Sequence, residues 1–178
     1  MKALSGKYYA TAPVDGGSFV RYGGYSGEWP RDGYTTSIDI YLDKAQNTFD
    51  PDTQLFEYSS AIEKQCTPAQ IAADKNDRTF FCFLRDFIFH FFSDGSGNFI
   101  IGGNNNADPG YVPSNFPERF TISSTGWYTF WHCFHAKGDG TLEVVMSILD
   151  AKGNVRGSSI RNDSSDVIAT VVGGDRYG

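Results

Sequence analysis

Residues 79–92 are the most distinctive stretch of the chain, because they are apolar almost throughout and rich in phenylalanine. Three polar residues, Arg85, Asp86 and His90, nevertheless lie inside this stretch. Successive side chains of a β-strand point to opposite faces of the sheet. The odd positions therefore form a phenylalanine-rich core face that also carries Arg85, whereas the even positions place Cys82, Asp86 and His90 on the other face. The pattern predicts a long strand with one core side and one polar working side.

The rest of the chain repeats strand-like segments between clusters of glycine, asparagine and aspartate. Aromatic residues make up 16% of the 178 residues, and 20 glycines separate the aromatic runs. This composition favours an all-β protein with a single domain, residues 1–178. Because several segments are long and no repeat of fixed period is present, we predict an antiparallel β-sandwich of jelly-roll type, with a barrel as the alternative. The expected strands are 7–11, 18–22, 35–42, 54–62, 79–92, 98–102, 119–123, 127–136, 141–149, 154–161 and 167–172.

One short helix is predicted between residues 67 and 75. Thr67 suits the N-cap, Pro68 the first helical position, and Gln70 the third residue after the cap, as in a capping box.

Charge and hydropathy exclude several classes of partner. The net charge is -6 and no long basic run occurs, which disfavours nucleic acid and anionic membrane surfaces. No stretch is long and apolar enough to predict a membrane-spanning helix.

The first residues do not form a signal peptide, so the chain is either cytoplasmic or begins after a removed leader. The chain is also either complete or excised from a longer protein. We expect an extracellular or cell-surface protein.

The chain has three cysteines, so at least one is unpaired: Cys66, Cys82 and Cys133. Two of them, Cys82 and Cys133, fall in expected strands, and both a cross-strand disulfide and buried free thiols remain open.

An aspartate precedes an asparagine by four positions at three expected turns, for example in Asp94…Asn98. The ordinary interpretation is turn chemistry, in which the side chains bond to their own backbone. The alternative is calcium, since residues 94–98 offer oxygen atoms at alternate positions and the loop that follows contains Asp108. The sequence predicts no cofactor, with calcium as the one alternative. The ligands of such a calcium ion would be Asp94, Asn98 and Asp108.

The polar face of residues 79–92 is the first candidate site. Asp86 could orient His90 as a general acid or base, the two could share a metal, or both could be structural. On the strand at 35–42, Asp39 and Tyr41 are expected to face the same way. Residues 127–136 are aromatic on both sides. We assign Trp127 and Trp131 to the aromatic core and therefore place His132 near the polar face.

The phenylalanine-rich face carries one charge, Arg85, which needs a partner if it is buried. The expected partner is a carboxylate such as Glu57 or Glu143, unless a bulge turns Arg85 outward.

Tyr25 and Trp29 lie in an aromatic loop, residues 22–34. Such a loop either stacks on sugar rings or folds over the edge of the sandwich with Trp29 as a plug.

Residues 36–43 and 126–130 resemble jelly-roll strands of the concanavalin A-like lectin/glucanase superfamily. The chain lacks the Glu-x-Asp-x-x-Glu strand of the members that cleave β-glucans, and Phe89-His90-Phe91 only partly resembles the Gln-Ile-His strand of alginate-lyase-like members. The resemblance implies recognition of a polysaccharide or glycan on the concave sheet or its loops, without fixing an activity.

Three functions follow as hypotheses. The first is a carbohydrate-binding module, in which Tyr25, Trp29 and Tyr111 stack on sugars while Asp39 and Asp86 bind hydroxyls. The second is a small glycan-cleaving lyase or hydrolase, with Tyr41 or His90 as acid or base, Asp86 orienting His90, and Arg85 or His132 balancing charge. The third is an adhesion or structural domain.

Overall fold

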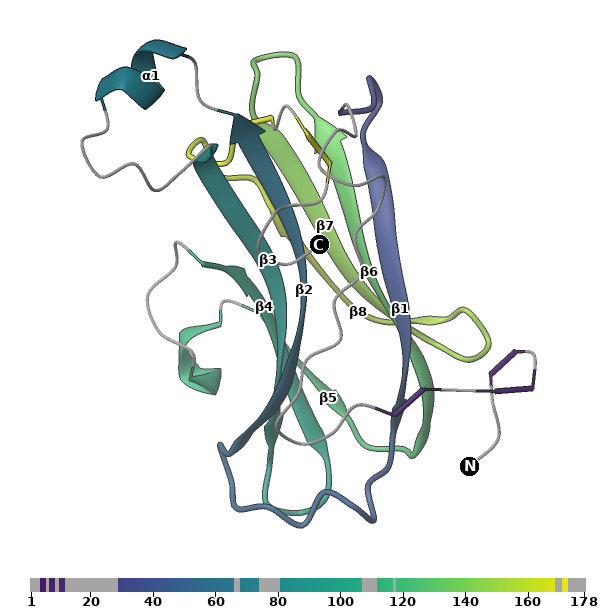
Figure 1. Ribbon diagram of the computed structural model, residues 1–178. Helices are drawn as coiled ribbons and strands as arrows, with labels where there is room; N and C mark the ends of the chain where they lie inside the picture. The colour runs from purple at the N-terminus through teal and green to yellow at the C-terminus, as the bar shows by residue number, and fades with distance from the viewer. Residues whose placement is uncertain are drawn as a thin grey trace.

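The computed structural model describes residues 29–65, 68–73, 81–106, 112–116, 118–168 and 171–172, together with residues 4, 5, 7, 8, 10 and 11. Most of the described elements are strands, as the composition predicts (Figure 1). The elements are β1 (Tyr34–Leu42), β2 (Gln54–Gln65), α1 (Pro68–Ala73), β3 (Phe81–Ser93), β4 (Phe99–Asn105), η2 (Pro113–Asn115), β5 (Arg119–Ile122), β6 (Gly126–Ala136), β7 (Leu142–Asp150), β8 (Val155–Arg161) and β9 (Val171–Val172).

The ends of the chain depart most from the expected strands. Residues 7, 8, 10 and 11 are not in a strand, and the strand expected at 18–22 lies outside the described residues. The predicted helix is present as α1. In the described part of the chain, no helix is long and apolar enough to span a bilayer.

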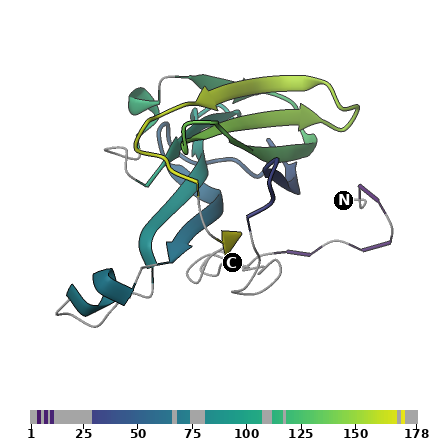
Figure 2. The ribbon, with the colours of Figure 1, turned by 90° about the horizontal axis from the view of Figure 1, so that it is seen from above.

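The strands form two antiparallel sheets. The four-stranded sheet has the order β1-β6-β7-β8, and the five-stranded sheet has the order β5-β4-β3-β2-β9. The chain passes from one sheet to the other between β1 and β2, between β5 and β6, and between β8 and β9. Figure 2 shows the two sheets as separate layers, with β6, β7 and β8 above β2 and β3.

The two sheets pack against each other through aromatic side chains. Phe89 and Phe91 of β3 make edge-to-face contacts with Phe130 of β6, at ring-centroid distances of 5.3 and 4.8 Å. Phe87 meets Phe134 in the same way at 5.5 Å. These rings are at most 1% exposed, so they form the centre of the hydrophobic core. The predicted phenylalanine-rich core face is therefore confirmed for these three residues of β3.

The other face of β3 is also buried. Asp86, Ile88, His90 and Phe92 are between 0 and 6% exposed, although they point away from the four-stranded sheet. We call this outward side of the five-stranded sheet the covered face. The prediction of an accessible polar side on this strand is wrong, because other parts of the chain lie over it.

Candidate functional site

His90 is held on the covered face by polar side chains from two neighbouring strands. Its Nδ1 lies 2.6 Å from Oε1 of Glu57 on β2, and its Nε2 lies 2.7 Å from Oδ1 of Asn104 on β4. The contact with His90 lowers the pKa of the Glu57 carboxyl below its usual value, against the opposing effect of partial burial. Both ring nitrogens are thus engaged by the protein itself.

Phe116 closes the space above His90. The two rings stack with centroids 5.3 Å apart and an interplanar angle of 24°. Gly102, opposite His90 in the sheet register, allows this approach, because a Cβ there would lie 2.3 Å from the Phe116 ring. His90 is 0% exposed as a result, whereas the Glu57 side chain remains 42% exposed. This arrangement fits a structural histidine better than an acid or base that must reach a substrate.

Asp86 does not orient His90, contrary to the prediction. The two residues share a face but are four positions apart on one strand, a separation of about 13 Å. Asp86 is paired instead with Asn106, whose Nδ2 lies 3.4 Å from Oδ2 of Asp86. Its backbone carbonyl also accepts a hydrogen bond from the backbone N–H of Asn106. Asp86 therefore fixes the end of β4 rather than a catalytic imidazole.

Arg85 lies on the core side of β3, as predicted, and has a buried carboxylate partner. That partner is Asp166, with 2.9 Å between Nε of Arg85 and Oδ1, so the expected pairing with Glu57 or Glu143 is wrong. Arg161 binds the other carboxylate oxygen at 2.5 Å, and Asn105 donates to the same group at 3.0 Å. Charged and polar groups of the protein thus engage both oxygens of this buried carboxylate.

His132 lies between the sheets and not beside His90. Its ring packs against Tyr58 at 5.0 Å and against Phe89 at 4.8 Å, and the residue is 0% exposed. Burial lowers the pKa of His132 to about 3, so its imidazole is neutral at ordinary pH. The expectation that His132 joins the Asp86–His90 face is wrong, because even positions of β6 face the core.

Asp39 and Tyr41 lie on the outward side of the other sheet. Asp39 accepts a hydrogen bond of 2.6 Å from Thr129, and Tyr41 packs edge-to-face on Trp127 at 5.4 Å. Since β1 and β3 belong to different sheets, these two residues do not share a face with Asp86 and His90. The predicted catalytic set of Tyr41, Asp86 and His90 is therefore split between opposite sides of the molecule.

Trp29 packs against the core edge, where it contacts Tyr34 at 5.1 Å and Phe134 at 6.4 Å. This position matches the interpretation of Trp29 as a plug. Tyr25 and Tyr111, the other predicted stacking residues, lie outside the described residues.

Asp94 and Asn98 form a hydrogen-bonded turn. Oδ1 of Asp94 accepts the backbone N–H groups of Ser96 and Asn98 at 2.7 and 2.9 Å, and its Oδ2 accepts the Asn98 side-chain amide at 2.6 Å. These bonds lower the pKa of the Asp94 carboxyl. Asp108 lies outside the described residues, and within them no cluster of three or more metal-ligating side chains occurs.

The outward side of the four-stranded sheet is accessible, and we call it the open face. In its centre Trp131 of β6 is 41% exposed. The outward side chains around it are exposed or half-buried, and they include the Asp39–Thr129 pair and the Ser147–Ser158 pair, whose hydroxyl oxygens are 3.0 Å apart. The expectation that Trp127 and Trp131 belong to the aromatic core is wrong, because the odd positions of β6 point outward and the even positions face the core.

Cys133 also lies on the open face. It is a free thiol, so the disulfide considered between Cys82 and Cys133 does not form. Its sulfur lies 3.3 Å from Nε2 of His135 and accepts a hydrogen bond from the Thr35 hydroxyl at 3.2 Å.

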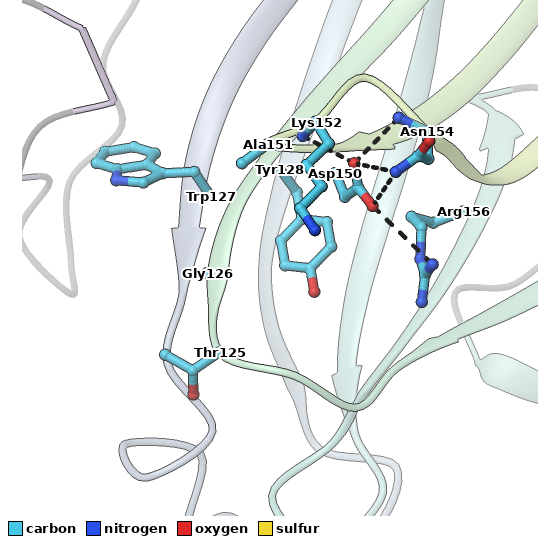
Figure 3. A pocket seen from close by; sticks show the side chains of 9 residues that line it. All are labelled: Thr125, Gly126, Trp127, Tyr128, Asp150, Ala151, Lys152, Asn154 and Arg156. Atoms are coloured by element: carbon cyan, nitrogen blue, oxygen red, sulfur yellow. Dashed lines mark hydrogen bonds and ion pairs between the residues drawn. The ribbon is translucent and has the colours of Figure 1, made fainter.

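An open hollow of about 340 Å³ lies where β6, β7 and β8 meet. Figure 3 shows Trp127 projecting on one side of β6 and Tyr128 on the other. Trp127 therefore borders both the hollow and the open face. The lining residues are Thr125, Gly126, Trp127, Tyr128, Asp150, Ala151, Lys152, Asn154 and Arg156.

Comparisons with protein-family models, with curated proteins and with solved structures found no match.

Proposed function

We propose that the chain is an extracellular carbohydrate-binding module that holds a polysaccharide or glycan across the open face. The observation that carries this proposal is Trp131, a large aromatic side chain that is 41% exposed in the middle of an uncovered sheet. Aromatic rings stack on the apolar faces of sugar rings, whereas hydroxyl and carboxylate groups bind the sugar hydroxyls. Asp39, Thr129 and Ser147 supply such groups beside Trp131.

The arrangement of aromatic residues suits an extended ligand. Trp127 and Trp131 lie on the same face of β6 four residues apart, at about 13 Å along the strand. Since Trp127 also borders the hollow, a glycan chain that stacks on Trp131 can reach the charged side chains of Lys152 and Arg156.

The two-sheet architecture is consistent with a jelly roll of the concanavalin A-like kind. Long antiparallel strands are divided between two sheets, and the chain changes sheet between β1 and β2, between β5 and β6, and between β8 and β9. This pattern supports the glycan-binding proposal at the level of fold, whereas the residues of the open face carry the functional argument.

A glycan-cleaving enzyme is supported less well, because the three residues expected to act together lie on opposite sides of the molecule. An adhesion domain is the second candidate. It is favoured by Ile160 and Val155 of β8, which are 64% and 62% exposed and would suit a protein partner.

The test is a panel of polysaccharides, with retention followed by affinity electrophoresis and affinity measured by calorimetry. Trp131→Ala should weaken binding by about tenfold or more, equivalent to ~1.4 kcal/mol. The matched control is Phe49→Ala, which removes a 53% exposed aromatic side chain in the connection between β1 and β2. This control should bind like the wild type.

Three outcomes would count against the proposal. If no glycan is retained, the adhesion domain is favoured. If Trp131→Ala and Phe49→Ala bind equally well, the open face is not the site. If soluble sugars are released and His90→Ala stops the release without unfolding the protein, the chain is an enzyme.

A further inference from the structure

The strand β1 forms one edge of the four-stranded sheet. Among the strands that the structure describes, it pairs only with β6. The pairing runs from Tyr34 opposite Phe134 to Leu42 opposite Gly126 without a shift of register. An edge strand of nine residues with unbroken pairing presents a long, regular row of backbone groups on its other side.

Several of the features that usually protect an edge strand are missing from β1. Its sequence, Tyr-Thr-Thr-Ser-Ile-Asp-Ile-Tyr-Leu, contains no proline, lysine or arginine, and no bulge interrupts it. The opposite edge strand, β8, has such features. Its register shifts beside Val155, and it carries Arg156 and Arg161. Among the described residues, the sheet therefore has more protection against further pairing at β8 than at β1.

Ile38 is exposed where an apolar side chain should be covered. It pairs with Phe130, which is 0% exposed, so it belongs to the row that faces the core. Ile38 itself is 42% exposed because it lies at the sheet edge. A strand added alongside β1 would place a side chain next to Ile38 and remove it from water.

The charge pattern of β1 suits a second copy of the same strand. In an antiparallel pair with Ile38 opposite itself, Asp39 of each copy faces Ser37 of the other, and Thr36 faces Ile40. Asp39 is the one charged residue in β1, so no like charges meet in this register. A pair centred on Asp39 would bring two carboxylates together and is disfavoured.

We propose that the protein forms a twofold-symmetric dimer through antiparallel pairing of β1 with β1 of a second copy, with Ile38 at the symmetry axis. The two four-stranded sheets then join into one continuous sheet across the dimer. The proposal does not depend on glycan binding, because the edge of β1 and the open face are different surfaces. If both proposals hold, the dimer presents two open faces side by side, which strengthens attachment to a polymeric ligand.

The test is sedimentation velocity of the full chain over a range of concentrations, with two substitutions at the exposed Ser37. Ser37→Asp places a carboxylate opposite Asp39 of the partner copy twice in the dimer, so the dimer dissociation constant should rise tenfold or more. Ser37→Lys places an ammonium group there, so the dimer should be as stable as the wild type or more stable. Urea unfolding of each variant checks that the fold is kept.

Ile160→Lys is the matched control on the other edge strand, where Ile160 is 64% exposed. It should leave the dimer intact, whereas Ile38→Lys should give a monomer. The proposal is overturned if the wild type stays monomeric at every concentration, if the two Ser37 variants change dimerisation equally, or if Ile160→Lys dissociates the dimer as strongly as Ile38→Lys.

Discussion

His132 is an ionisable side chain enclosed by aromatic rings, and this makes the stability of the protein sensitive to pH. In the folded state burial lowers the pKa of His132 to about 3, whereas an unfolded histidine titrates near 6.5. Between these values the unfolded chain binds a proton that the folded chain does not bind. Acid therefore favours unfolding, and the free energy of unfolding should fall by about 1.4 kcal/mol per pH unit below pH ~6.5.

The measurement is urea unfolding between pH 7.5 and 5, with His132→Phe as the comparison. The phenylalanine keeps a ring beside Tyr58 and Phe89 but cannot take up a proton. Glu57, whose pKa is lowered, adds its own loss of stability only below its usual pKa of 4.5, outside this range. The free energy of unfolding should fall less steeply with decreasing pH in His132→Phe than in the wild type. Equal slopes in the two proteins would show that His132 does not cause the effect.

Gly102 has no side chain, and this allows the Phe116 ring to stack on His90. An alanine there would place its Cβ 2.3 Å from the Phe116 ring and push this ring away from His90. Gly102→Ala should destabilise the fold by about 1–3 kcal/mol, as overpacking typically does. Gly126→Ala is the control, because a Cβ at that strand position meets only Tyr128, at 4.0 Å. The free energy of unfolding of both variants is measured with a denaturant. Equal losses of stability in the two would refute this account of the Phe116 position.

The hairpins between β3 and β4 and between β7 and β8 are closed by the same loop. In the second hairpin Asp150 accepts hydrogen bonds from the backbone of Lys152 and from both the backbone and side chain of Asn154, as Asp94 does with Ser96 and Asn98 in the first. A glycine with positive φ precedes each asparagine. In these two hairpins, the spacing of aspartate and asparagine is thus explained by turn geometry.

The loop of the second hairpin gives a prediction about backbone conformation alone. Gly153 has φ +80°, and an added Cβ would meet nothing within 4 Å. Gly153→Ala should therefore cost about 1–2 kcal/mol through strain in the left-handed region. Gly138→Ala is a close match, since Gly138 also has open space around it but no positive φ. Thermal unfolding should show a loss of stability for Gly153→Ala only. If both variants lose stability, the cause is the loss of glycine flexibility and not the positive φ of Gly153.

At the scale of elements, the strands could be predicted from the sequence but their surroundings could not. Alternation located β1, where apolar side chains recur at every second position, and a nearly continuous apolar run located β3. The two-residue period of a strand placed His90 on a polar face, but it did not show that other parts of the chain cover this face. The residues that enclose His90 come from β2, from β4 and from the segment after η2. Such contacts depend on strand pairing, which periodicity does not determine.

The strand β6 illustrates the same limit in another way. Both of its faces carry aromatic residues, so alternation did not tell which face meets the core. Pairing with β1 and β7 decides the question, since the side chains opposite His132 and Phe134 include the buried Met146 and Val144. Trp131 then becomes the centre of the open face and His132 becomes a core residue. A single sequence offers no signal for this choice.

At the scale of the whole molecule, a buried cluster of charges links the two sheets. Asp166 is 1% exposed and binds Arg85 and Asn105 of the five-stranded sheet together with Arg161 of the four-stranded sheet. Its backbone carbonyl also accepts the backbone N–H of Leu142, at the start of β7. The segment that follows β8 is thereby fixed between the sheets at one end of the core.

Asp166→Asn should destabilise the whole molecule, because it keeps the shape of the side chain but removes the buried negative charge that Arg85 and Arg161 share. Removing one partner of a buried ion pair typically costs about 3–5 kcal/mol. Asp163→Asn is the matched control, since Asp163 also approaches Arg161, at 3.8 Å, but its side chain is 49% exposed. This exposed pair is screened by water, so its loss should change stability little. Urea unfolding should show a single cooperative transition that is shifted to lower urea only in Asp166→Asn. If the two variants unfold alike, the buried cluster does not hold the sheets together, and the aromatic core between β3 and β6 is sufficient for this.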